Sequence, residues 1–179
     1  MARLELHHRY KASLDSIFKA FTQPKLLTRW FAPMNMSVPK VDLDLKVGGE
    51  CCFTMKDSDG NEVTTRGRFL EIVPIKKLAF TWGWENSHEP VTTVSVSMRQ
   101  QDGQTVVILT HEGFRNEEER NKHAAGWNDI LGKLEDSLQR SPERKPTRKQ
   151  RIKEKHKAKS REFKGRVKSI TKQRIKRVA

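Results

Sequence analysis

Histidine and carboxylate side chains are the residues of this chain with the clearest capacity for chemistry. His111 and Glu112 are adjacent, and His123 follows further along. A zinc-binding helix would need a second histidine four residues after the first, and Arg115 occupies that position. We therefore predict no metal site and no bound cofactor. The ionisable groups that we expect around an internal cavity are Glu71, His111, Glu112 and His123.

The other reactive residue types do not form a catalytic pattern. Cys51 and Cys52 are adjacent and have no close basic partner in the sequence to activate a thiolate. Neighbouring residues of a strand point to opposite faces, so the pair predicts no disulfide framework. The chain also contains no nucleophile-elbow serine, phosphate-binding loop or dinucleotide fingerprint. No catalytic residue is predicted, and an enzyme that uses an internal cavity remains an alternative.

Charge divides the chain at about residue 138. Residues 1–138 carry 18 basic and 19 acidic side chains, whereas residues 139–179 carry 18 basic and only 3 acidic ones. All four tryptophans lie in the first part, so we expect one globular domain over 1–138 and a basic tail over 139–179. Because no apolar run is long enough to span a bilayer and the N-terminus does not resemble a signal peptide, we expect a cytoplasmic protein.

The basic tail predicts contact with a polyanion. Its charge density is too high for a hydrophobic core, so we expect it to be disordered or partly helical. Lysine and arginine that neutralise phosphates release counterions, which gives salt-sensitive binding without sequence preference. Nucleic acid is the leading partner, and an acidic membrane surface, an acidic protein or a simple solubilising role are the alternatives. The predicted contact residues are Arg148, Lys149, Arg151, Lys153, Arg174, Lys176 and Arg177.

Hydrophobic periodicity predicts the elements that position these groups. A first strand over 3–10 is followed by a helix capped by Ser13 and by a second short helix that continues through Trp30 and Phe31 to Pro33. Alternating segments and tight turns over 41–111 then predict about six antiparallel strands in a curved sheet. On one of these strands, Leu78, Phe80, Trp82 and Trp84 share a face.

The last element is a long helix of about six turns. Asn116 can cap it, and Glu119 stands at the capping-box position three residues later. An apolar stripe that includes Trp127 must be buried, and the concave face of the sheet is the surface available for it. Trp82, Trp84 and Trp127 should therefore share one interior. Gly126, inside this helix, predicts a close approach of the helix backbone to the sheet.

The order of these elements is that of the helix-grip fold, and several stretches resemble one family that adopts it. These stretches are Ala20–Pro24 with Trp30-Phe31, Val47-Gly48-Gly49, Gly67–Pro74, Leu78–Trp82, Leu109–Phe114 and Gly126-Trp127. Over about residues 5–138 the chain resembles the activator of heat-shock protein 90 ATPase homologue family of the START/SRPBCC superfamily. The resemblance implies an α+β helix-grip fold in which a curved antiparallel sheet of six to seven strands wraps a long C-terminal helix.

The resemblance also implies a hydrophobic cavity between sheet and helix that binds a small apolar molecule. The alternative that the family name implies is a co-chaperone-like module that stimulates a chaperone ATPase in a stress response. The implied cavity lining is Trp30, Phe31, Phe53, Met55, Phe69, Phe80, Trp82, Trp84, Val96, Met98, Trp127, Ile130 and Leu131.

Overall fold

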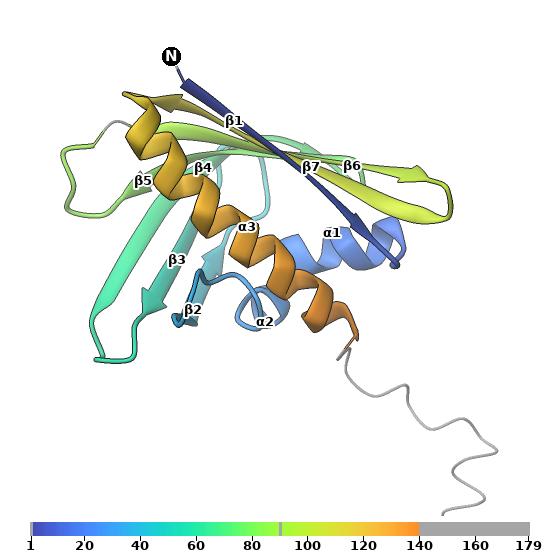
Figure 1. Cartoon of the computed structure of the whole chain (residues 1–179), viewed down its shortest axis with the longest axis horizontal. Helices are drawn as coiled ribbons and strands as arrows, with labels where there is room; N and C mark the ends of the chain where they lie inside the picture. The colour runs from blue at the N-terminus through green and yellow to red at the C-terminus, as the bar shows by residue number, and fades with distance from the viewer. Residues whose placement is uncertain (1, 90, 140–179) are drawn as a thin grey trace, which may run out of the picture. The chain divides into compact units, whose positions relative to one another are not determined.

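The computed structural model of the chain describes residues 2–89 and 91–139, and the basic residues predicted to contact a polyanion lie outside them. Across these described residues, seven strands and three helices follow one another in a strand, helix, helix, six strands, helix order (Figure 1). Their bounds are β1 Ala2–Tyr10, α1 Leu14–Thr22, α2 Pro24–Leu27, β2 Ser37–Leu43, β3 Glu50–Lys56, β4 Glu62–Val73, β5 Lys77–Trp84, β6 Thr92–Gln101, β7 Gln104–Phe114 and α3 Glu117–Gln139.

The strands form one antiparallel sheet whose order is β1-β7-β6-β5-β4-β3-β2. Each of β2 to β7 pairs with its sequence neighbour. β1 pairs with β7 and forms one edge of the sheet. The sheet is bent, and α3 runs along its concave side, with α1 and α2 beneath the same side (Figure 1). This arrangement is the predicted helix-grip fold, so the fold prediction is confirmed.

The helices begin and end largely where local chemistry places them. The Ser13 hydroxyl accepts a hydrogen bond from the Ser16 amide at 3.1 Å, and the Asn116 side chain accepts one from the Glu119 amide at 2.9 Å, so both predicted caps are confirmed. The second helix is shorter than predicted. It ends at Leu27, and the amides of Arg29 and Trp30 then bond three residues back, to the carbonyls of Leu26 and Leu27, as in turns.

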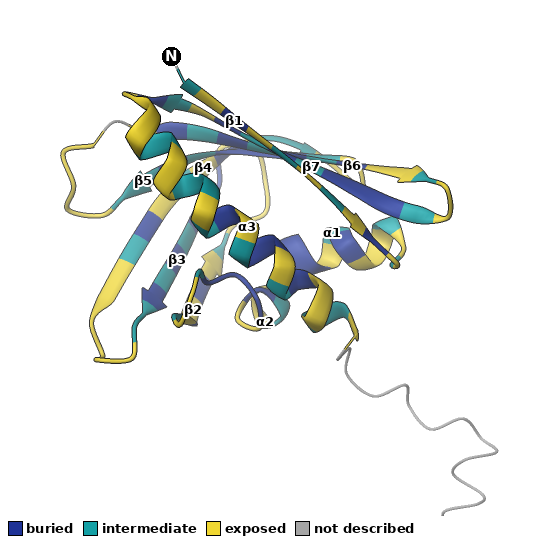
Figure 2. Ribbon diagram, viewed as in Figure 1, coloured by how far each residue is buried: buried dark blue, intermediate teal, exposed yellow. Residues whose placement is uncertain are grey.

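The core lies between the concave face of the sheet and the helices. Figure 2 shows α3 with buried residues toward the sheet and exposed residues on its outer side. Aromatic rings dominate the contact: the Trp82 ring centroid lies 5.3 Å from that of Trp127 and 6.0 Å from that of Trp84. The predicted common interior of these three tryptophans is therefore confirmed. Within the described residues, no helix combines the length and apolar character needed to cross a membrane.

Candidate functional site

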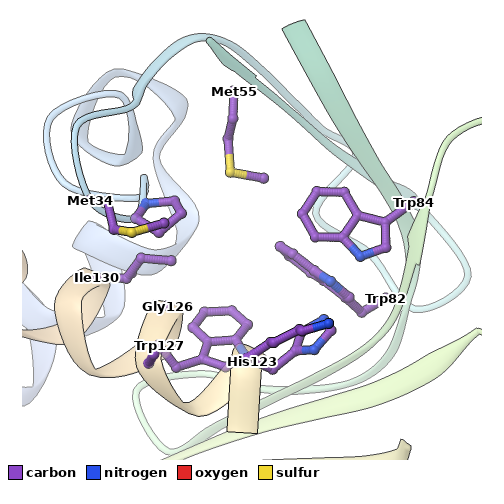
Figure 3. A pocket seen from close by; sticks show the side chains of 11 residues that line it. Met34, Met55, Trp82, Trp84, His123, Gly126, Trp127 and Ile130 are labelled. Carbon is purple, nitrogen blue, oxygen red and sulfur yellow. The ribbon is translucent and has the colours of Figure 1, made fainter. Parts of the chain in front are cut away.

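A pocket of about 210 Å³ opens between α3, β5 and the loop after α2 (Figure 3). We call it the α3 pocket. Three aromatic rings, two methionines and small residues of α3 make its wall almost entirely apolar, and only Lys122 and His123 bring ionisable side chains to it. The lining residues are Pro33, Met34, Met55, Trp82, Trp84, Lys122, His123, Ala125, Gly126, Trp127 and Ile130.

Two charged residues of α3 hold the loop that forms one rim of the pocket. The Lys133 ammonium group donates to the carbonyl oxygens of Ala32, at 2.8 Å, and Met34, and the Asp129 carboxylate accepts from the Met34 amide. Lys133 and Asp129 also form an ion pair at 2.9 Å. Met34, held by this clamp, has a left-handed backbone conformation (φ 47°) and is 72% exposed at the pocket mouth.

His111 stands behind the pocket, fully buried, in a chain of directed hydrogen bonds. The Trp127 indole N–H donates to its Nδ1 at 3.0 Å, and an indole N–H can only donate, so Nδ1 carries no hydrogen. The hydrogen of the neutral ring is therefore on Nε2, which lies 2.7 Å from the Thr92 hydroxyl. That hydroxyl in turn donates to the carbonyl of Trp82 at 3.0 Å. The chain joins α3 to β7, β6 and β5.

Burial fixes the charge of His111 as well as its tautomer. Burial lowers the pKa of His111 to about 3, and the neighbouring His123, whose ring centroid is 5.1 Å away, adds to this lowering. A proton on Nδ1 would also place two donors against each other at the Trp127 contact. His111 is therefore a neutral structural residue and is unsuited to act as a general acid near neutral pH.

This lowered pKa predicts a loss of stability in acid. An unfolded chain would have the ordinary histidine pKa of about 6.5, so between pH 6.5 and 3 the unfolded state binds more protons at this site. The stability that the neutral, buried His111 contributes is fully present above pH 6.5. Below pH 6.5 the free energy of unfolding falls by up to about 1.4 kcal/mol per pH unit. Urea unfolding at pH 7.5, 5.5 and 4.5 measures this slope. A His111→Gln variant with the same slope as the unsubstituted protein would contradict the assignment.

His123 lies beside this network and borders the α3 pocket. Its Nδ1 is 3.0 Å from the Glu119 carbonyl, an acceptor, so Nδ1 carries the hydrogen and Nε2 is the acceptor of the neutral ring. The ring packs against Phe114 at 5.0 Å and Trp84 at 6.4 Å between centroids. His123 is half-buried, so its ring is accessible to a bound molecule in a way that the His111 ring is not.

The implied cavity residues divide into pocket wall and filled core. Met55, Trp82, Trp84, Trp127 and Ile130 line the α3 pocket. The others are buried and packed with one another; for example, the rings of Phe31 and Phe53 stack at 4.3 Å between centroids. These core residues are Trp30, Phe31, Phe53, Phe69, Phe80, Val96, Met98 and Leu131.

Two of the four ionisable candidates lie away from the pocket. A β-bulge between Phe69 and Glu71 places Glu71 opposite Ala79, on the outer face, where it forms an ion pair with Lys77 at 2.6 Å. Glu112 follows the inward-facing His111 and so points outward, where it pairs with Arg3 at 3.2 Å. The expectation that these two carboxylates border the cavity is therefore wrong. Of the two histidines, His123 lines the pocket, and His111 packs behind it at 5.1 Å between ring centroids.

Sequence reasoning missed several residues of the pocket wall. Gly126 was expected to bring α3 close to the sheet, but a Cβ at this position would meet only the Pro33 side chain, at 3.7 Å. That expectation is wrong, since the space beside Gly126 belongs to the pocket. The helical spacing of 123, 126, 127 and 130 places these residues on one face and would have identified Gly126. Pro33 and Met34 lie in an irregular loop that has no such periodic signal.

The remaining reactive groups form no second centre in the described part of the chain. No three His, Cys, Asp or Glu side chains gather there in an arrangement that could hold a metal ion. Cys51 is buried and Cys52 is half-buried, and both are free thiols. Burial raises the pKa of the Cys51 thiol to about 12, so this thiol is not poised to react.

Solved structures share this architecture. A protein from Nitrosomonas europaea is 26% identical, with a TM-score of 0.68 over 76% of this chain and 94% of that chain. An AHSA1 protein from Silicibacter pomeroyi is 25% identical, with a TM-score of 0.70 over 76% and 97%. An AHSA1-like protein from Aeromonas hydrophila, at 20% identity and a TM-score of 0.66 over 77% and 92%, shares the fold.

A family profile covers most of the chain. No protein of curated function matches the sequence. The profile described as "Activator of Hsp90 ATPase homolog 1-like protein" matches residues 11–139, which hold all three described helices, six of the seven described strands and the whole wall of the α3 pocket. The chain therefore belongs to the Activator of Hsp90 ATPase homolog 1-like family.

Proposed function

We propose that this protein binds a small, largely apolar molecule in the α3 pocket. The observation that carries the proposal is an aromatic-lined space of about 210 Å³ in a domain whose other aromatic residues are closely packed. Ligand pockets are clefts lined mainly by apolar and aromatic side chains with a few polar groups, and the α3 pocket has this character.

The volume sets the size of the ligand. An engineered apolar cavity of about 150 Å³ is large enough to bind benzene. The α3 pocket, at about 210 Å³, is larger than this and matches a substituted or fused aromatic ring better than a long acyl chain. The rings of Trp82, Trp84 and Trp127 provide flat apolar surfaces for edge and face contacts with such a ring.

The indole N–H signals of the four tryptophans offer a direct test. Trp82, Trp84 and Trp127 line the pocket, whereas Trp30 donates to the Ala20 carbonyl at 3.3 Å and is not part of the wall, so it serves as an internal reference. Titration with toluene, naphthalene and decanoate should shift the three pocket signals and leave the Trp30 signal nearly unchanged. The proposal fails if none of these compounds moves a pocket signal.

We further propose that the segment 139–179 is an arm that contacts polyanions, because 18 of the 36 basic side chains are concentrated there with only 3 acidic ones. The domain over 1–138 would then hold the ligand, and the arm would bring it to a nucleic acid. Seven residues of the arm carry this prediction: Arg148, Lys149, Arg151, Lys153, Arg174, Lys176 and Arg177.

Deleting 139–179 should abolish binding to a labelled 20-base-pair DNA duplex and leave the thermal midpoint almost unchanged. The full chain should bind at least about tenfold more weakly at 200 mM than at 50 mM salt, because each phosphate contact releases counterions. Fluorescence anisotropy at both salt concentrations measures this. Equal affinity of the full and truncated chains would refute the proposal.

A further inference from the structure

One buried hydrogen-bond donor of the α3 pocket has no partner. The indole Nε1–H of Trp82 meets no acceptor among the described residues, although Trp82 is only 5% exposed. The buried indoles of Trp30 and Trp127, by contrast, donate to the Ala20 carbonyl and to His111. A buried donor without an acceptor has lost its hydrogen bonds to water without replacement, so a ligand that supplies an acceptor gains affinity.

A hydrogen-bond acceptor without a partner among the described residues lies on the same side of the pocket. His123 donates through Nδ1 to the Glu119 carbonyl, and its Nε2, an acceptor in the neutral ring, has no hydrogen bond to any described residue. The Trp84 ring lies 6.0 Å from Trp82 and 6.4 Å from His123, so both groups flank the same neighbour. Figure 3 shows the nitrogens of Trp82, Trp84 and His123 grouped on one side of the pocket.

We propose, building on the proposed function, that the α3 pocket binds a phenol of about the size of naphthol. Its oxygen accepts the hydrogen bond from Trp82 Nε1–H, and its O–H donates to His123 Nε2. A hydroxyl group is the smallest group that both donates and accepts, whereas a carbonyl oxygen would satisfy Trp82 alone and leave His123 without a donor. The rest of the pocket wall is almost entirely apolar and suits the fused rings.

Binding of this kind requires Trp84 to turn aside. The Trp82 Nε1 atom is shielded from solvent in the empty pocket. Trp84 packs edge-on against Trp82, at an interplanar angle of 81°, and is only half-buried at the end of β5. We therefore expect Trp84 to rotate outward and admit the hydroxyl, and its indole signal should move together with that of Trp82.

Three matched compounds test the proposal with the full-length protein. 2-Naphthol donates and accepts, 2-methoxynaphthalene only accepts, and naphthalene does neither. We expect 2-naphthol to bind about tenfold more tightly than naphthalene, with the ether between them, because a hydrogen bond to a desolvated partner contributes about this factor. Calorimetry or nuclear magnetic resonance titration gives the dissociation constants. The Trp82 indole proton should move downfield with the two oxygen compounds, whereas the shift that naphthalene causes should not be downfield.

A His123→Phe variant keeps the ring volume and removes both nitrogens. It should reduce the preference for 2-naphthol over naphthalene to about threefold or less, while His88→Phe, at an exposed histidine outside the pocket, keeps the full preference. Equal binding of the three compounds by the unsubstituted protein would overturn the phenol assignment and leave apolar ligand binding intact. If none of the three binds, both proposals fail.

Discussion

Replacing His111 with alanine is expected to lower the free energy of unfolding by about 3–5 kcal/mol. The ring is fully buried, so its removal leaves a cavity between β7 and α3. The Trp127 indole N–H, which donates to Nδ1 at 3.0 Å, is also left without an acceptor in the interior. The two losses add, because one is a loss of packing and the other is the cost of an unpartnered buried donor. Urea unfolding of the full chain at pH 7.5 measures the change.

Two further variants separate the causes of this loss. His111→Leu retains most of the side-chain volume. The difference in the free energy of unfolding between this variant and the unsubstituted protein therefore measures the hydrogen bonds to Trp127 and Thr92. His88→Ala removes an exposed histidine and should change stability by less than about 0.5 kcal/mol. If His111→Ala costs no more than His88→Ala, the buried hydrogen-bond chain does not hold the domain together.

The alternation of buried and exposed residues made the sheet and the long helix predictable. Trp82 and Trp84 share a face because the strand period is two, and Trp127 meets them because the apolar stripe of α3 has only the concave face to cover. Short-range signals succeeded at Ser13 and Asn116, where a side chain caps the helix that immediately follows. These features depend on neighbours in sequence or on one repeating period.

Features that depend on one irregularity were not predictable. The bulge after Phe69 turns Glu71 to the outer face, and no residue type in that strand marks the inserted position. Trp30 and Phe31 have helical spacing, yet they lie after α2, which ends at Leu27. Their rings pack edge-on at 5.4 Å between centroids. The periodic pattern cannot distinguish a helix from a turn that buries the same side chains.

The sequence also could not predict which aromatic residues pack in the core and which line the pocket. Phe53 and Met55 are two residues apart on β3 and face the same interior, but Phe53 stacks on Phe31 whereas Met55 borders open space. The distance between α3 and each part of the sheet decides which side chains meet. The pocket also needs the Met34 loop as its rim, and the Asp129 and Lys133 hydrogen bonds that attach this loop to α3 follow from no periodic pattern of residue types.

Filling the pocket from α3 is expected to abolish ligand binding without weakening the fold. In Gly126→Leu the new side chain starts 3.7 Å from the Pro33 Cβ, an ordinary contact distance, and extends into the space that the ligand would occupy. Leucine also favours the helix over glycine by about 0.8–1 kcal/mol. Affinity for naphthalene should therefore fall at least about tenfold, while the free energy of unfolding stays constant or rises by about 1 kcal/mol.

Gly132 provides the matched control because it lies on the same helix, is exposed and has no neighbour within 4 Å of a Cβ. Gly132→Leu gains the same helix propensity but adds nothing to the pocket, so its affinity for naphthalene should equal that of the unsubstituted protein. Because both variants change the same residue type within one helix, a difference between them isolates occupation of the pocket from stabilisation of α3. Equal affinities of the two variants would place the binding site elsewhere.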